Sequence, residues 1–172
     1  MFLVDTNVLV YATNEEAAEH THCRRLLERW RQHETAWFTT WGVLYEFLRV
    51  VSHPRIFPHP WRVDRAIGYV GSLLASPSLV VLTPTSKHSS ILAQTAREVP
   101  ELAGNILHDV HTVVLMREHG IRRIVTRDAD FYRFPFLEVI DPLTLERQDR
   151  VRERPAKSAN SRRRASRPRA RA

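Results

Sequence analysis

The chain has 172 residues, of which 43% are hydrophobic and 9% aromatic, and its formal net charge is +7. This length and apolar content suffice for one globular domain with its own core, and they exclude a disordered chain. No apolar run approaches the roughly 18 residues of a membrane span. The first residues lack a basic n-region and a cleavage-site pattern, so we expect no signal peptide. A single cysteine, Cys23, allows no internal disulfide and is assigned a structural role. We expect a cytoplasmic protein without membrane association.

The positive charge is concentrated near the C-terminal end. Residues 151–172 contain nine Lys or Arg and one acid, which leaves 17 basic and 18 acidic residues in 1–150. The same stretch has no aromatic residue and one large aliphatic residue, so it cannot bury enough apolar surface to offset chain entropy. We therefore predict a folded domain over residues 1–146 and a disordered, arginine-rich tail over residues 147–172.

Strand-like and helix-like segments alternate along the folded domain. Apolar runs of strand type occupy residues 2–5, 36–40, 78–84, 122–126 and 136–142. Amphipathic segments with helical spacing occupy residues 14–33, 41–52, 61–75, 85–97 and 105–119. Thr40 and Ser86 are the expected N-caps of the second and fourth helices, and Gly120 is expected to end the last. Three prolines predict a loop over 53–60.

The alternation of strands and helices predicts an α/β fold. The runs LVVL (79–82) and RIV (123–125) lack the polar alternation of a half-exposed strand, which indicates strands buried on both faces. Helices on both faces of a parallel sheet satisfy this pattern, so we predict an α/β/α sandwich with a central parallel sheet of about five strands. In such folds, functional sites lie outside the carboxyl ends of the strands.

Acidic residues recur at that edge of the predicted sheet. Asp5 ends the first strand, and Asp128 and Asp130 follow the fourth. Glu46 interrupts an otherwise apolar helix directly after the second strand, and Asp109 lies near the start of the helix over 105–119. Because the carboxyl ends of parallel strands share one edge, all of these carboxylates can face the same place.

Each acid alone also has an ordinary structural interpretation. Asp5 could cap a following turn, and Glu46 could pair with Arg49 at i, i+3. Asp109 could stabilise the positive end of its helix dipole. Asp128 and Asp130 could be turn residues.

Taken together, the carboxylates favour a metal site. Clustered carboxylates repel one another without a counterion, and an oxygen-only set suits Mg²⁺ or Mn²⁺. Such ions support the hydrolysis of phosphodiesters. His108 and His111 flank Asp109 without a third soft ligand, so we assign them packing or rim positions rather than zinc binding. The sequence has no Walker-type loop, no GxGxxG and no G-x-S-x-G.

Four blocks of this sequence resemble the acidic blocks of PIN-domain proteins, and in particular the VapC-type toxins of bacterial toxin–antitoxin pairs. In chain order they are MFLVDTNVLVYA, WGVLYEFLRVVSHPRIF, GNILHDVHTVVLMREHG and TRDADFYRFPFLEVIDPL. The resemblance runs from residue 1 to about residue 143. It implies a PIN-like nuclease domain, metal-dependent endoribonuclease activity, a homodimer, and inhibition by a cognate antitoxin that covers the active-site groove.

The resemblance also implies roles for individual residues. The catalytic quartet falls on Asp5, Glu46, Asp109 and Asp128. The metal is expected on Asp5 and Asp109 with help from Asp128, whereas Glu46 positions water or metal. The supporting positions that hydrogen-bond the site are Thr6, Asn7 and Thr126, and Asp130 is a second acid with a less defined role. The expected products carry 5′-phosphate and 3′-hydroxyl ends.

The arginine-rich tail departs from the family pattern. Its basic side chains, with Arg162, Arg163, Arg164, Arg167 and Arg169 as the candidate RNA contacts, would bind polyanions by counterion release without reading sequence. A tail without any function is an equal alternative.

Two rival functions remain open at this point. In the first, the protein is a non-catalytic nucleic-acid-binding PIN-like protein that uses its basic tail, although all four acidic positions are intact. In the second, it is an aspartyl-nucleophile phosphatase. That class needs Asp-x-Asp after the first strand, where this chain has Asp5, Thr6 and Asn7. The apolar residues Trp30, Phe47, Leu48 and Trp61 are expected in the core, with a groove for the antitoxin as the alternative.

Overall fold

The computed structural model describes residues 1–32, 34–100 and 102–145. The predicted tail, with its candidate RNA contacts, therefore lies outside the described residues, as does the boundary at 146/147. In the described part, no helix has the length and apolar character needed to cross a membrane.

The core of the fold is a five-stranded sheet in which every pairing is parallel, with strand order β3-β2-β1-β4-β5. Its strands are β1 (Leu3–Val4), β2 (Trp37–Thr40), β3 (Leu79–Leu82), β4 (Arg123–Val125) and β5 (Glu138–Ile140). All five lie inside the predicted strand segments, so the predicted sheet is confirmed. The short β1 lies at the centre, where it pairs with β2 and β4.

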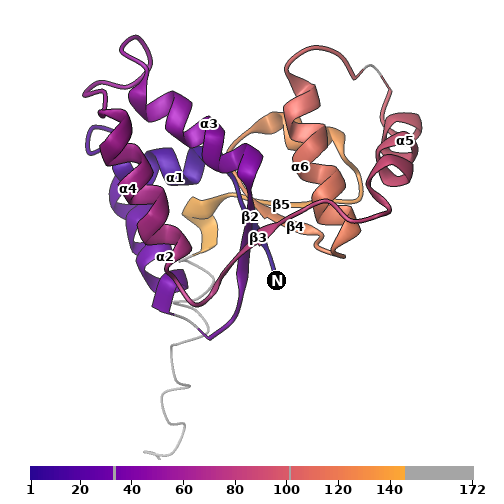
Figure 1. Cartoon of the computed structure of the whole chain (residues 1–172), viewed down its shortest axis with the longest axis horizontal. Helices are drawn as coiled ribbons and strands as arrows, with labels where there is room; N and C mark the ends of the chain where they lie inside the picture. Colours follow the sequence, from indigo (N-terminus) through magenta and orange to yellow (C-terminus); the bar gives the residue numbers. More distant parts are fainter. Residues whose placement is uncertain (33, 101, 146–172) are drawn as a thin grey trace, which may run out of the picture.

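Helices cover both sides of the sheet. They are α1 (Thr6–Thr13), α2 (His20–Gln32), α3 (Trp41–Ser52), α4 (Val63–Leu74), α5 (His88–Glu98) and α6 (Ile106–Glu118), with a 3₁₀ helix, η1, over Ala129–Arg133. Helices α1 to α4 lie on one side, and α5 and α6 on the other (Figure 1). The α/β/α sandwich is thus confirmed. The sequence did not predict α1 or η1.

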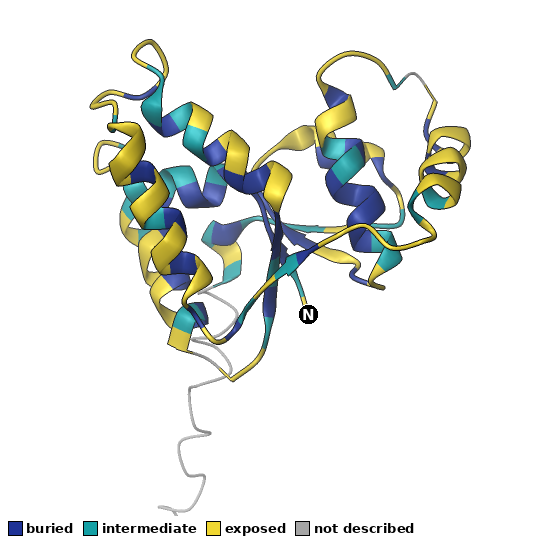
Figure 2. Cartoon of the chain, viewed as in Figure 1, coloured by how far each residue is buried: buried dark blue, intermediate teal, exposed yellow. Residues whose placement is uncertain are grey.

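Successive side chains of the central strands point to opposite faces of the sheet, and each face carries its own hydrophobic core. Val4 and Val125 pack among α1, α2, α3 and α4, whereas Leu3 and Ile124 pack against α6 and the segment after β4. All four side chains are at most 1% exposed. Figure 2 shows the buried residues gathered along the sheet and the helix faces turned toward it. The prediction of a strand buried on both faces is correct for Ile124 and Val125 of β4, and the central β1 is buried in the same way.

That prediction is wrong for β3. Val80 is 42% exposed, although Leu79 and Val81 on either side pack against the first core. The reason is topological, because β3 is an edge strand and the helices cover only one of its faces at this position. The continuous apolar run LVVL therefore does not report burial on both sides.

The predicted helix ends are mostly correct. The Thr40 side chain accepts a hydrogen bond from Val43 N at 3.1 Å, as expected of an N-cap. Gly120 follows α6 with a φ of +69°, a conformation that favours glycine. Ser86 is not a cap, because α5 begins later, at His88, with Lys87 in the cap position. Cys23 is buried, and desolvation raises its thiol pKa to about 12, as its structural role requires.

Candidate functional site

The parallel register brings two of the predicted acids to one edge. Leu3 pairs with Ile124 and Val4 with Val125, so the chain after β1 leaves the sheet beside the chain after β4. The backbone N–H of Asp5 donates to Val125 O at 3.2 Å, which fixes Asp5 at the carboxyl end of both strands. Asp5 is only 7% exposed.

Asp5 is held by two hydrogen bonds to one of its oxygens. Thr126 Oγ1 donates to Asp5 Oδ2 at 2.7 Å, and Asn7 Nδ2 donates to the same oxygen at 2.7 Å. Asp5 occupies the N-cap position of α1, but its side chain makes no cap hydrogen bond. The capping interpretation of Asp5 is therefore wrong, and the supporting positions predicted at Asn7 and Thr126 do contact it.

Thr126 connects both strand ends. Its Oγ1 also accepts hydrogen bonds from Asn7 Nδ2 at 2.7 Å and from the backbone N–H of Asp128 at 2.9 Å. Asn7 Oδ1 in turn accepts from the backbone N–H of Arg127 at 3.2 Å. Thus the loop carrying Asp128 is fastened to the start of α1 through buried or half-buried polar side chains.

Asp128 and Asp130 follow this loop. Asp128 Oδ1 accepts from the backbone N–H of Asp130 at 2.9 Å and caps η1, so its turn interpretation is correct as local geometry. Asp130 lies 3.4 Å from the guanidinium of Arg133, a partner that the sequence analysis missed although the i, i+3 spacing would have revealed it. Both acids are exposed.

Glu46 reaches the site from α3. Thr6 Oγ1 donates to Glu46 Oε2 and to Val43 O, each at 3.3 Å, which places Glu46 next to the residue that follows Asp5. On its other side, Glu46 Oε1 lies 3.3 Å from the Arg49 guanidinium, so the expected i, i+3 pair is also present. Glu46 can therefore form its ion pair with Arg49 and lie at the acidic site at the same time.

Asp109 lies in the first turn of α6 and is half-buried. Burial, followed by repulsion from Asp5, Asp128, Glu46 and Asp130, raises the pKa of Asp109 to about 7. Burial also raises the pKa of Asp5 to about 6, opposed by the Thr126 hydrogen bond and reinforced by Glu46 and Asp128. The fold thus brings Asp109 into electrostatic range of the other four predicted acids.

The chemistry of this set fits a hard divalent cation, since its donors are carboxylate oxygens that repel one another. In the structure, however, the carboxylate oxygens of these acids do not point toward one common position. Within residues 1–32, 34–100 and 102–145, no three His, Cys, Asp or Glu side chains are placed closely enough to hold a metal ion. Side-chain rotation of the exposed acids would be needed to complete a coordination shell, whereas Asp5 is already fixed.

The two histidines on α6 lie outside the carboxylate set. The ring of His111 packs edge-on against that of His88 at 5.7 Å, and its Nδ1 is next to Gly42 of α3. His108 is exposed. These are the packing and rim positions expected for them.

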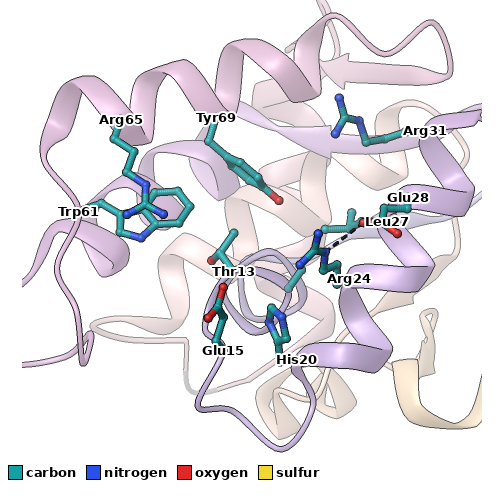
Figure 3. A pocket seen from close by; sticks show the side chains of 11 residues that line it. Thr13, Glu15, His20, Arg24, Leu27, Glu28, Arg31, Trp61, Arg65 and Tyr69 are labelled. Carbon is teal, nitrogen blue, oxygen red and sulfur yellow. Dashed lines mark hydrogen bonds and ion pairs between the residues drawn. The ribbon is translucent and has the colours of Figure 1, made fainter.

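A separate pocket of about 270 Å³ lies between α1, α2 and α4 (Figure 3). None of the predicted acids lines it. On one wall, the Arg65 guanidinium stacks over the Trp61 ring at 4.0 Å, and Tyr69 lies beside it. Of the apolar residues considered for a groove, Trp30 and Phe47 are buried in the core, while Leu48 and Trp61 are partly buried.

Comparison with known proteins identifies the family of this chain. The PIN domain family model matches residues 2–137. The chain belongs to the PIN-domain family. Ribonuclease VapC37 of Mycobacterium tuberculosis (strain ATCC 25618 / H37Rv) is 36% identical over 134 residues, which cover 78% of this chain and 92% of that protein. Ribonuclease VapC43 of the same strain is 34% identical over 143 residues, covering 83% and 96%. The family resemblance expected from the acidic blocks is confirmed.

Solved structures show the same PIN-like fold. Mycobacterium tuberculosis VapC20, described as a sarcin–ricin loop cleaving toxin, superposes with a TM-score of 0.58 at 21% identity, covering 82% of this chain and 100% of that one. VapBC2 from Rickettsia felis, bound to a DNA fragment from its promoter, gives 0.58 at 18% identity, covering 80% and 96%. At these identities the structures support the fold alone.

Proposed function

We propose that this PIN-domain protein is a metal-dependent endoribonuclease and the toxin of a toxin–antitoxin pair. The observation that carries the proposal is the buried Asp5, fixed by Thr126 and Asn7 and electrostatically coupled to Asp109 across the sheet edge. The relatives named ribonucleases, at 34–36% identity over most of the chain, support RNA as the substrate.

Asp5, Asp109 and Asp128 would hold Mg²⁺, or Mn²⁺ in its place. When bound, such an ion supplies Lewis acidity for the attack of water on the phosphodiester. Thr126 and Asn7 keep Asp5 Oδ2 in a fixed orientation, so that this carboxylate needs no rearrangement. Glu46 Oε2, which accepts a hydrogen bond from Thr6, would position the attacking water or the metal. Attack by water with departure of the 3′ oxygen, which takes up a proton, would leave 5′-phosphate and 3′-hydroxyl ends.

The partners follow from the same proposal. The acidic blocks resemble VapC-type toxins of toxin–antitoxin pairs, and the relatives of 34–36% identity carry the name VapC, which supports a cognate antitoxin for this chain. We propose that the antitoxin covers the acidic edge, that the toxin is a homodimer, and that it acts on cytoplasmic RNA.

The basic tail is proposed to raise the affinity for RNA. Nine Lys or Arg against one acid in residues 151–172 contrast with a nearly neutral remainder of the chain. Deleting residues 151–172 should weaken RNA binding and flatten its dependence on salt, because fewer counterions are released. An unchanged affinity and salt slope would show that the tail has no part in binding.

The test of the proposed function is cleavage of total bacterial RNA with and without Mg²⁺ or Mn²⁺. The intact protein should give discrete fragments that require the metal. Asp5→Asn and Asp109→Asn should abolish them, whereas Asp64→Asn, an exposed acid on α4, should cleave normally. Fragments that persist in both site variants would contradict the proposal. RNA binding without cleavage by folded, metal-loaded, antitoxin-free protein would favour the non-catalytic alternative.

A further inference from the structure

Helix α3 carries a stripe of exposed side chains that the packing of the domain does not use. Trp41 and Tyr45 are 46% and 67% exposed, and the Arg49 side chain is 59% exposed. These residues are four apart in sequence, so they follow one another along one face of the helix. The two rings are neighbours, with centroids 6.1 Å apart and planes inclined by 45°. The buried face of α3, with Val43 and Phe47, points into the first core.

The stripe is continuous with the candidate active site. Glu46 directly follows Tyr45 and lies beside Thr6, one residue from Asp5. Arg49, at the end of the stripe, contacts the other oxygen of Glu46 at 3.3 Å. Exposed residues extend along α3 on the side away from the core (Figure 2). A strand of RNA that entered the acidic site would therefore meet these side chains next.

We propose that Trp41, Tyr45 and Arg49 form a binding track for single-stranded RNA, on which unpaired bases stack and a phosphate contacts Arg49. This inference rests on the proposed ribonuclease function and names the form of RNA that the site accepts. Flat aromatic rings bind any unpaired base through its π-face, whereas the base faces of a duplex are already covered by their neighbours. Exposed aliphatic residues elsewhere, such as Ile67 on α4, cannot make this contact.

Charge favours the same occupant. The carboxylates that would hold the metal repel a polyanion, and residues 1–150 contain 17 basic and 18 acidic residues. Apart from the attraction proposed for the basic tail, attraction for phosphate would come from cations near the site. Arg49 is such a cation, and its exposed guanidinium can contact a phosphate while it stays next to Glu46.

The experiment measures RNA binding by the full chain with Asp109→Asn as the common background, so that the probe is not cleaved. The probe is a fluorescent oligoadenylate, alone or annealed to oligouridylate. Tyr45→Ala and Trp41→Ala should each weaken binding of the single strand by about five- to a hundredfold. Tyr45→Phe should bind like the background protein, because stacking needs the ring and not the hydroxyl. Ile67→Ala is the matched control and should not change the affinity.

Several results would overturn the track. The first is single-strand affinity in Tyr45→Ala equal to that of the background protein, and the second is an equal loss for the duplex. A third is a change of oligomeric state in Tyr45→Ala, measured by sedimentation, without any loss of RNA affinity, which would make the stripe an interface between copies. If any one of these three results occurs while the unmodified protein still cleaves RNA with metal, only the proposed RNA-binding track is wrong. If the unmodified protein neither binds nor cleaves RNA, the proposed function fails as well.

Discussion

Thr126 Oγ1 donates a 2.7 Å hydrogen bond to Asp5 Oδ2 across 121 positions of sequence, and both residues are almost completely buried. A buried carboxylate without partners would be costly, and its proton would be hard to remove. The hydrogen bond from Thr126 opposes this effect of burial on the pKa of Asp5. Because Thr126 also accepts from the N–H of Asp128, one hydroxyl positions two of the proposed metal ligands.

Thr126→Val should therefore reduce metal-dependent cleavage by about 10- to 100-fold, the usual effect of removing a residue that orients a metal ligand. The variant keeps the shape of the side chain but loses the three hydrogen bonds that the hydroxyl makes with Asp5, Asn7 and the backbone N–H of Asp128. The affinity for Mg²⁺, measured from the dependence of the cleavage rate on Mg²⁺ concentration, should also fall in this variant.

Thr126→Ser is the matched control, because it restores the hydroxyl and should recover most of the activity. Equal activity of Thr126→Val and the unmodified protein would show that Asp5 is positioned by the backbone and Asn7 alone.

The pH dependence of stability should report the crowded carboxylates. The pKa of Asp109 is about 7 in the folded protein against an ordinary value of 3.8, so between these values the folded state binds more protons than the unfolded state. Without metal, this group therefore lowers the free energy of unfolding as pH rises from about 4 to 7. Asp5, with a pKa of about 6, acts in the same direction.

Asp109→Asn should remove this penalty. In urea unfolding with EDTA, the variant should be more stable than the unmodified protein at pH 8 by ~2–4 kcal/mol, and the two should converge near pH 4. A constant difference at all pH values would mean that Asp109 is not perturbed by its neighbours.

The acids of this site could be predicted from the sequence because the strands of a parallel sheet all end at the same edge. Asp5 and Asp128 follow predicted strands, and their common edge is a consequence of topology alone. The sequence could not reveal that Asn7 reaches Thr126, 119 positions away, because such contacts are set by tertiary packing.

The missed helix has a different cause. Helix α1 is short and buries Val8, Leu9 and Ala12 against the first core, so its eight residues lack the polar face from which an amphipathic helix is recognised. Its β-branched residues also favour a strand interpretation. The exposure of Val80 was missed because sequence alone does not say which strand lies at the edge of the sheet.

Gly120→Ala should destabilise the domain by ~1 kcal/mol or more. Gly120 has a φ of +69° after α6, and alanine pays a steric penalty in that region. Gly68→Ala is the control, because Gly68 lies inside α4 and a Cβ there meets no atom within 4 Å. That variant should be neutral or stabilising by up to ~1 kcal/mol, since alanine is the better helix former. Urea unfolding at one pH measures both, and equal effects would contradict the conformational argument.

Metal binding should stabilise the folded protein by an amount that grows with the logarithm of the metal concentration above the Kd. At a Mg²⁺ or Mn²⁺ concentration a hundredfold above the Kd, the free energy of unfolding should rise by about 2.7 kcal/mol. For a domain of this size, this corresponds to a Tm increase of roughly 5–10 °C. EDTA should reverse the increase.

The site variants identify where the ion acts. Asp5→Asn and Asp109→Asn should lose the thermal shift, because each removes a proposed ligand, whereas Asp64→Asn on α4 should keep it. Differential scanning fluorimetry at matched ionic strength separates this effect from general screening, which acts on all four proteins alike. A shift of the same size in Asp5→Asn and Asp109→Asn would place the ion elsewhere and remove the metal from the proposed mechanism.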